Sequence, residues 1–196
     1  MKIVIVGIQG AGKSTQGNLL SEKLGIPYLS SGHIFRQMAQ EKTPTGRWLK
    51  ETINAGILIP DDMTLKVVLE YLEKPEYQAG YILDGFPRTV VQAEQFNGGV
   101  DKVIFLDVSD KEALWRISGR LDNREDETLV AIRKRIELFH EWTLPVLDFY
   151  QVQNKLIRID GEQDVVKVFD DIVTGLGIKS TPARRLVSKK TKTHHG

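Results

Sequence analysis

Short runs of consecutive apolar residues alternate along this chain with longer segments in which apolar residues recur every three or four positions. The short runs are typical of strands buried on both faces of a parallel sheet, and they lie at residues 2–6, 26–29, 81–85, 102–108 and 155–159. The longer segments predict helices at residues 13–24, 110–121, 126–141 and 164–177. Strands that alternate with helices predict an α/β fold with a doubly wound parallel sheet.

One long segment, residues 30–73, departs from this alternation. Its pattern is helical throughout, with interruptions at Thr43–Pro44 and Ile59–Pro60, and it contains no run typical of a strand. We therefore predict several short helices here, which form a flap on the sheet.

The composition indicates one globular domain: 196 residues, of which 41% are hydrophobic and 27% are charged. The chain has no cysteine, which excludes disulfides, thiolate catalysis and a cysteine-ligated zinc site. The apolar run at residues 2–6 is too short for a signal peptide, and no segment has the length of a membrane span. We expect a cytoplasmic protein.

The net charge of +1 is unevenly distributed. Residues 179–196 hold six Lys and Arg and no acidic residue, which leaves 21 basic and 26 acidic residues in 1–178. A segment that is basic and lacks apolar periodicity is typical of a disordered tail. We expect a solubilising extension here, with contact to RNA as the alternative.

The first strand leads directly into a glycine-rich loop, "GIQGAGKST" at residues 7–15, and then into a helix. Gly7, Gly12, Lys13 and Ser14 have the spacing of a phosphate-binding loop. Backbone N–H groups of such a loop and the helix N-terminus attract anions. Lys13 can reach the β- and γ-phosphates and the Ser14 hydroxyl can ligate Mg²⁺, so the loop predicts a site for a nucleoside triphosphate.

The type of nucleotide enzyme depends on what the loop accompanies. The chain has neither the Asn-Lys-x-Asp string nor the Asp-x-x-Gly string of a GTPase, and it is short for a motor or transporter ATPase. A small kinase remains, and phosphoryl transfer between two nucleotides needs several cations. Candidates are Arg36, Arg88, Arg116, Arg120, Arg124 and Arg135. Arg116 and Arg120 are four residues apart on one helix face, and Arg124 follows closely.

Six motifs occur in the order seen in adenylate kinases: "GIQGAGKST", "YLSSGHIFR", "GILIPDD", "LDGFPRTVVQ", "RISGR" and "REDETLVAIRKR". The chain resembles that family over residues 1 to about 175. The resemblance implies a monomeric P-loop kinase with a five-stranded parallel sheet flanked by helices. It also implies a core at 1–29, 60–120 and 126–178, a small helical flap for the nucleoside monophosphate at 30–59, and a very short lid at 121–125. The reaction would convert ATP and AMP into two ADP with Mg²⁺.

The resemblance also implies roles for individual residues. Those implied for ATP are Gly10, Ala11, Gly12, Lys13, Ser14, Thr15, Arg116, Arg120 and Gln163. Those implied for AMP are Ser31, Arg36, Ile57, Leu58, Ile59, Gly85, Phe86, Pro87, Arg88, Gln92, Arg124 and Arg135. The implied catalytic residues are Lys13, Asp84, Arg88, Arg120, Arg124 and Arg135; Ser14 and, through water, Asp84 would serve Mg²⁺.

The sequence departs from the family pattern at two places. His33 stands where family members usually carry an acid, and only "LDN" separates Arg120 from Arg124. With no cysteine, we expect no zinc in so short a lid. Two alternatives stay open at this point: a kinase for another monophosphate, such as UMP or CMP, and a nucleotide-dependent binding module with an RNA-contacting tail.

Overall fold

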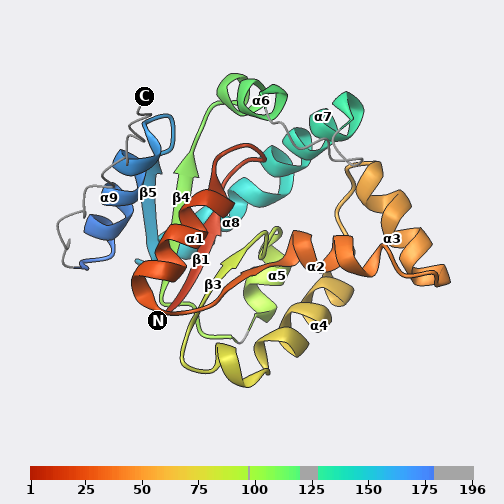
Figure 1. The fold of residues 1–196 in the computed structure, drawn as a ribbon, viewed down its shortest axis with the longest axis horizontal. Coiled ribbons are helices and arrows are strands. Elements are labelled where there is room, and N and C mark those ends of the chain that lie inside the picture. The colour runs from red at the N-terminus through yellow and green to blue at the C-terminus, as the bar shows by residue number, and fades with distance from the viewer. Residues whose placement is uncertain (97, 120–127, 179–196) are drawn as a thin grey trace, which may run out of the picture.

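The computed structural model describes residues 1–96, 98–119 and 128–178, and its centre is a five-stranded parallel sheet (Figure 1). The order across the sheet is β2-β3-β1-β4-β5, and every neighbouring pair is parallel. The strands are β1 (Lys2–Val6), β2 (Tyr28–Ser30), β3 (Tyr81–Asp84), β4 (Lys102–Asp107) and β5 (Leu156–Asp160). The predicted five-stranded α/β fold is confirmed.

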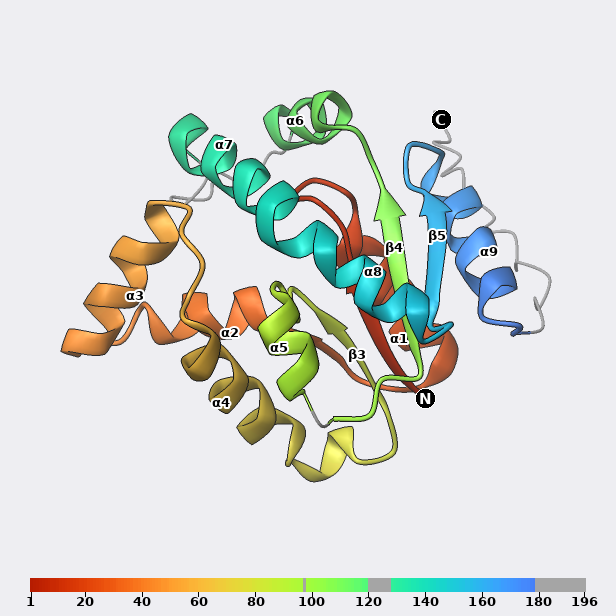
Figure 2. The same cartoon turned by 180° about the vertical axis from the view of Figure 1, so that it is seen from behind.

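Helices cover both faces of this sheet. Figure 1 shows α1 and α9 in front of it, and Figure 2, seen from behind, shows α5 and α8 on the opposite face. The α-helices are α1 (Lys13–Leu24), α2 (Ser31–Met38), α3 (Pro44–Asn54), α4 (Asp61–Leu72), α5 (Val90–Gln95), α6 (Asp110–Ser118), α7 (Leu129–Leu138), α8 (Leu144–Val152) and α9 (Val165–Gly175). A 3₁₀ turn, η1 (Pro75–Tyr77), precedes β3, and a π-helical stretch, η2 (Phe139–Thr143), joins α7 to α8.

The two-sided burial of the sheet explains why its strands are runs of apolar residues. Successive side chains of a strand point to opposite faces, so Ile3 and Ile5 pack with α1 and α9. Val4 and Val6 pack in a second layer, which includes α4, α5 and α8. All four side chains are at most 4% exposed. A polar residue at any of these positions would be buried, whichever face it occupied.

The segment predicted as a helical flap contains α2 and α3, and no strand is present in residues 31–72, all of which the structure describes. The two interruptions in its pattern precede helix starts. Thr43 caps α3, since its Oγ1 accepts a hydrogen bond of 2.9 Å from the Gly46 backbone N–H, and Pro44 occupies the first turn. Pro60 differs, since it occupies the N-cap position of α4 itself, and no side chain caps that helix among the described residues. Both views place α3 at the outer end of the molecule (Figures 1 and 2).

Several predicted boundaries were wrong. The second strand occupies Tyr28–Ser30 instead of 26–29. A helix was predicted over 126–141. In the described residues it begins at Leu129 and continues past residue 141, through η2 and α8, to Val152. Pro145 concealed α8 in the sequence, because proline usually ends a helix. In the structure Pro145 lies in the first turn of α8, where its missing N–H costs no helical hydrogen bond.

Some predictions fall on residues that the structure does not describe. The lid at 121–125, the tail at 179–196, and the side chains of Arg120 and Arg124 lie outside the described residues. Within the described part of the chain, none of the helices is both long enough and apolar enough to cross a bilayer.

Candidate active site

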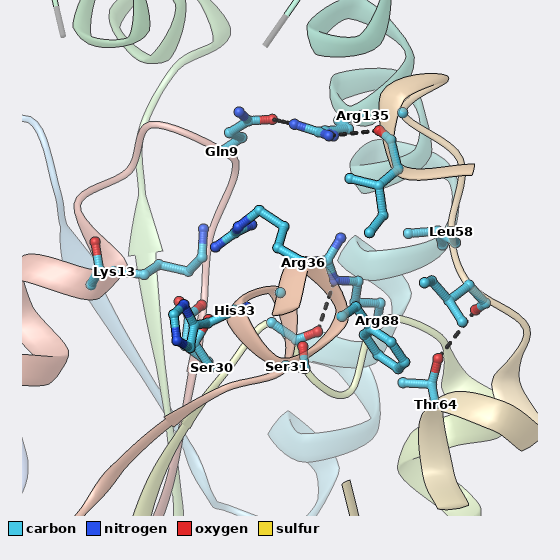
Figure 3. Close-up of a pocket in the computed structure, with 18 of the residues that line it drawn as sticks. Gln9, Lys13, Ser30, Ser31, His33, Arg36, Leu58, Thr64, Arg88 and Arg135 are labelled. Atoms are coloured by element: carbon cyan, nitrogen blue, oxygen red, sulfur yellow. Dashed lines mark hydrogen bonds between the residues drawn. The ribbon is translucent and has the colours of Figure 1, made fainter. Parts of the chain in front are cut away.

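A cavity of about 350 Å³ opens where the phosphate loop, α2 and the end of β3 meet (Figure 3). Parallel α/β sheets usually bind ligands beyond the carboxyl ends of their strands, and this cavity lies there. Four of its lining side chains are cationic and come from four separate segments: Lys13, Arg36, Arg88 and Arg135. Such a concentration of positive charge from distant parts of the chain suits a ligand with several phosphates.

The phosphate loop leaves a helix N-terminus available to an anion. Gly10 and Gly12 have φ of +93° and +88°, and α1 begins at the next residue, Lys13. Among the described residues, no side chain caps α1 and no acid lies in its first turn. The Lys13 ammonium donates hydrogen bonds to the Gly7 and Ile8 carbonyls, at 2.8 and 2.9 Å. Backbone N–H groups and a lysine therefore converge on one end of the cavity.

Asp84 ends β3 at the same end of the cavity. Its carboxylate is 8% exposed, and its Oδ2 accepts a hydrogen bond of 2.7 Å from the Tyr28 hydroxyl. Its Oδ1 is buried and has no hydrogen-bond partner within the described residues. A buried acceptor without a partner is unfavourable unless a water, an ion or a ligand completes it.

Arg88 is held in place by its own turn. Its Nε donates to the Gly85 carbonyl at 2.8 Å, and its backbone N–H donates to the Gln92 Oε1 at 2.7 Å. Its carbonyl accepts a hydrogen bond of 3.0 Å from the Thr143 hydroxyl. Because the backbone and Nε are already bonded, the terminal nitrogens of the guanidinium are positioned in advance for an incoming anion.

Arg88 lies close enough to other charged side chains for them to affect its protonation. Burial lowers the pKa of the Arg88 guanidinium, the nearby Asp84 carboxylate opposes this shift, and the charges of Arg135 and Arg36 lower the pKa further. An arginine stays protonated even so. The repulsion among these three guanidinium groups would be relieved by a polyanion bound between them.

Arg135 of α7 joins two sides of the cavity. Its Nη1 donates to Gln9 Oε1 of the phosphate loop at 3.2 Å, and its Nη2 donates to the Ile53 carbonyl at the end of α3 at 2.8 Å (Figure 3). In the sequence, Gln9 is 126 positions from Arg135, and Ile53 is 82 positions from it. The contact therefore ties the loop predicted for ATP to the flap predicted for AMP.

Gln92 is buried, at 1% exposed, yet it also lines the cavity. Its Nε2 donates to the Asp61 Oδ1 at 2.7 Å, and the Thr89 hydroxyl donates to the same oxygen at 3.1 Å. Next to it, the Thr64 hydroxyl donates to the Ile59 carbonyl at 3.2 Å. The amide of Gln92 thus has a fixed orientation at one end of the cavity.

The remaining predicted residues fall into three groups. Ser14, Ser31, Ile57, Leu58, Ile59 and Gly85 line the cavity, together with Gly10 and Gly12. Phe86 and Pro87 are buried below it and line a smaller cavity of about 70 Å³; Phe86 packs edge to face on Phe96 at 5.0 Å. Ala11, Thr15, Arg116 and Gln163 line neither cavity.

Two of the residues predicted for ATP are engaged elsewhere. The Arg116 Nε pairs with Glu112 Oε1 at 2.7 Å along α6. The Gln163 Nε2 donates to the Asp160 carbonyl at 3.1 Å and to Asp171 Oδ2 at 3.0 Å. The structure does not bring these two residues into the cavity.

Comparison with known proteins identifies the family. The family model described as "Adenylate kinase" matches residues 5–155. The adenylate kinase of Thermoanaerobacter sp. (strain X514) is 36% identical over 213 aligned residues, which cover 90% of this chain and 98% of that protein. The chain belongs to the adenylate kinase family.

Other adenylate kinases match over a similar share of the chain. The protein from Caldicellulosiruptor bescii is 30% identical and covers 91% of this chain and 100% of its own length. That from Fusobacterium nucleatum is 36% identical and covers 90% of this chain and 99% of its own. The resemblance read from the motifs is thus confirmed, and so is the enzyme class: the family's reaction is phosphoryl transfer from ATP to AMP.

Adenylate kinases act on ATP with Mg²⁺, and the residues of this site fit such an ion. Mg²⁺ prefers oxygen ligands and keeps several of its waters. The Oδ1 of Asp84, which has no partner in the part of the chain that the structure describes, can accept a hydrogen bond from one of those waters. The exposed Ser14 hydroxyl lies in the first turn of α1. Both residues line the cavity.

Several residues of the adenylate kinase site were not predicted from the sequence, among them Gln9, Tyr28, Asp61 and Thr64. Gln9 lay within the glycine loop, at a position without a specified residue type. Tyr28 and Asp61 lie within the motifs "YLSSGHIFR" and "GILIPDD" but had no role assigned, and Thr64 belongs to an ordinary helix pattern. What makes them part of the site is contact with Asp84, Gln92 or the cavity, which only the folded chain establishes.

Proposed function

We propose that the chain carries out the adenylate kinase reaction with the phosphates of ATP and AMP facing one another in the cavity of about 350 Å³. The observation that carries this proposal is the convergence of four cationic side chains from separate segments on that one cavity: Lys13, Arg36, Arg88 and Arg135. Phosphoryl transfer between two nucleotides gathers several negative charges in one place, and catalysis depends on cations that neutralise them.

The phosphate loop is the donor side. The N–H groups at the start of α1 and the Lys13 ammonium would hold the β- and γ-phosphates of ATP. Mg²⁺, when bound, supplies positive charge to the phosphate oxygens, with Ser14 as a ligand and Asp84 holding its waters. Arg116, Arg120 and Gln163 keep their proposed roles near ATP, although two of them line no cavity and Arg120 is not described.

The flap and the turn after β3 form the acceptor side. Ser31, Arg36 and Arg88 surround the space where the AMP phosphate would lie. Leu58 and Ile59 are partly buried and would contact the base. Gln92 would form hydrogen bonds with the edge of the base, because its Nε2 has a second N–H and its Oε1 a second lone pair beyond those used in the bonds to Asp61 and Arg88. Gln92 can pair with adenine because an amide offers both a donor and an acceptor.

Transfer itself would depend on alignment and charge neutralisation. Arg88 and Arg135 would contact the phosphates on either side of the group in transit, with Arg120 and Arg124 completing the set. A fixed arginine stabilises the charge that develops on the transferring group without any reorganisation. No side chain needs to act as a strong base.

The domain boundaries belong to the same proposal. We assign the flap to residues 30–59, the lid to 121–125, the core to 1–29, 60–120 and 126–178, and a separate tail to 179–196. The flap assignment is supported by α2 and α3, which lie between β2 and α4 and supply part of the cavity wall. A monomer located in the cytoplasm completes the proposal.

The test compares Arg135→Ala with Arg133→Ala. Both arginines lie on α7, but Arg133 is exposed and lines no cavity. We expect Arg135→Ala to lower kcat at least about 100-fold, and Arg133→Ala to keep it. The assay offers AMP, UMP and CMP as acceptors with ATP as donor. A preference for UMP or CMP would overturn the adenylate assignment, and equal activity of the two variants would overturn the role of the cavity.

A further inference from the structure

Tyr28 is a residue for which the reaction described above has no role, yet it reaches into the proposed metal site. It begins β2, and its side chain lines the cavity. Its backbone is paired with Ile82 of β3, two residues before Asp84. The hydroxyl nevertheless extends along the sheet to Asp84 Oδ2, at 2.7 Å.

This hydrogen bond makes the two carboxylate oxygens of Asp84 different from each other. One of them, Oδ2, accepts from Tyr28, and the other, Oδ1, is buried without a partner among the described residues. A carboxylate on a short strand end can rotate about its last bond, since that torsion is only broadly defined. A strong hydrogen bond to one oxygen fixes the rotation and keeps the other oxygen directed to its own place.

The phenol is held in the donating state by its surroundings. Burial raises the pKa of Tyr28, and the negative charge of Asp84 and the hydrogen bond to it raise the pKa further. At neutral pH a phenol is uncharged, because its ordinary pKa is about 10, and a neutral phenol beside a carboxylate can only donate to it.

The fold makes room for this side chain at a cost. Gly17 lies in the middle of α1, where glycine is less favourable than alanine. A Cβ at Gly17 would lie 2.3 Å from Cε2 and 2.6 Å from Cδ2 of the Tyr28 ring. The ring occupies the space that any larger residue at position 17 would need, so the helix residue and the ring fit each other.

From these contacts we propose that Tyr28 is a positioning residue for the metal: its hydroxyl orients Asp84 so that Oδ1 holds the waters of Mg²⁺. This inference rests on the proposed function, in which Asp84 serves Mg²⁺. Outer partners of metal sites commonly contribute tenfold or more to metal affinity. Tyr28 acts through Asp84 and a water, so we expect an effect near the lower end of that range.

The experiment measures Mn²⁺ binding, by electron paramagnetic resonance of the free ion, to enzyme saturated with a non-hydrolysable ATP analogue. Tyr28→Phe removes the hydroxyl and keeps the ring. We expect this variant to bind Mn²⁺ about 10-fold more weakly, with affinity for metal-free nucleotide and for AMP within twofold of the wild type. The Mg²⁺ concentration that gives half-maximal activity should rise by a similar factor.

A second variant displaces the ring and keeps the hydroxyl. Gly17→Ala forces the ring to move, so we expect it to weaken Mn²⁺ binding as Tyr28→Phe does, and the double variant to be no worse than either single one. Circular dichroism and the Tm identify any variant that is not folded; for such a variant the comparison rests on the other one.

The variant Asp84→Asn distinguishes the proposed role of Tyr28 from the proposed role of Asp84. If Asp84→Asn weakens Mn²⁺ binding and Tyr28→Phe stays within twofold of the wild type, Tyr28 is only a packing residue and the inference is overturned. If Asp84→Asn also binds Mn²⁺ as the wild type does, Asp84 does not serve the metal, and that part of the proposed function is overturned with it. If Tyr28→Phe has no effect in the Asp84→Asn background but a large one alone, the inference is supported.

Discussion

The side-chain amide of Gln92 is held by the carboxylate of Asp61, 31 positions earlier in the chain, through a hydrogen bond of 2.7 Å. Asp61 is the first residue of α4 and Gln92 lies in α5, so the bond joins two helices at the edge of the cavity. A side-chain amide can take two orientations that exchange its oxygen and nitrogen, and this contact selects the one with Nε2 toward Asp61. The Arg88 backbone N–H fixes the same orientation from the Oε1 side.

This relationship predicts that Asp61 controls AMP binding without touching AMP. Asp61→Ala removes the acceptor that orients Gln92, and we expect the KM for AMP to rise about tenfold, since a hydrogen bond to a charged group is worth about 1.5–3 kcal/mol. The KM for ATP should change less than twofold. Asp61→Asn retains an acceptor oxygen and should give an intermediate value. Steady-state kinetics with each nucleotide varied in turn measure these constants.

Asp62→Ala is the matched control for that experiment. Asp62 is the next residue and also an acid in the first turn of α4, but it is exposed. Both substitutions remove one negative charge from the N-terminus of the same helix, so both lose the same favourable interaction with its dipole. Equal KM values for AMP in the two alanine variants would show that Asp61 has no role beyond that helix.

Gly85→Ala should damage the acceptor side of the site. Gly85 has a φ of +79°, and a Cβ there would lie 2.7 Å from Ser31 Oγ and 3.1 Å from Arg88 Nη2. Because these distances are too short, the two side chains would have to move, and both of them line the cavity. We expect the KM for AMP to rise at least about tenfold, because a misplaced group of about 1 Å can cost a factor of 100.

Gly25→Ala separates the steric effect from backbone strain. Gly25 has a similar φ of +64°, but a Cβ there would meet nothing within 4 Å. We expect both variants to lose about 1 kcal/mol of stability from the positive φ, measured by urea unfolding. Only Gly85→Ala should change the KM for AMP; an equal change in Gly25→Ala would contradict the steric explanation.

The buried side chain of Tyr150 should make the free energy of unfolding decrease at alkaline pH. Burial raises the pKa of Tyr150 from its ordinary value of 10.0 to about 12. A raised pKa in the folded state means that the tyrosine's contribution is fully present below pH 10 and is lost as the pH rises toward 12, because the unfolded chain ionises first. The loss amounts to about 2 kcal/mol by pH 12. Urea unfolding of Tyr150→Phe and wild type at pH 8 and pH 11.5 measures it; the wild type should lose more stability between the two than the variant.

Removal of residues 179–196 should leave kcat and both KM values unchanged. Among the described residues, those that line the cavity all lie within residues 9–135. The segment carries six Lys and Arg and no acid, so its loss changes mainly the net charge. A coupled assay of the shortened chain checks the expectation, and a large loss of turnover would assign the tail a catalytic role.

Local patterns in the sequence were enough to predict which segments form the sheet and which loop would bind a phosphate. Apolar runs such as residues 2–6 can be satisfied only by burial on both faces, and the glycines of residues 7–15 permit backbone conformations that other residues rarely adopt. These are local properties, and they were readable from adjacent residues. The same holds for the starts of α3 and α4, which coincide with the interruptions at Thr43–Pro44 and Ile59–Pro60.

Tertiary structure alone decided how the site residues hold one another. Tyr28 and Asp84 are 56 positions apart, and Gln9 and Arg135 are 126 apart, so no local pattern could pair them. The three tryptophans show the same limit: tryptophan is a residue type that is highly buried on average, but Trp48, Trp115 and Trp142 are 41%, 70% and 48% exposed. Periodicity gives the face of a helix that is apolar, whereas burial of any one residue depends on what the rest of the chain places against it.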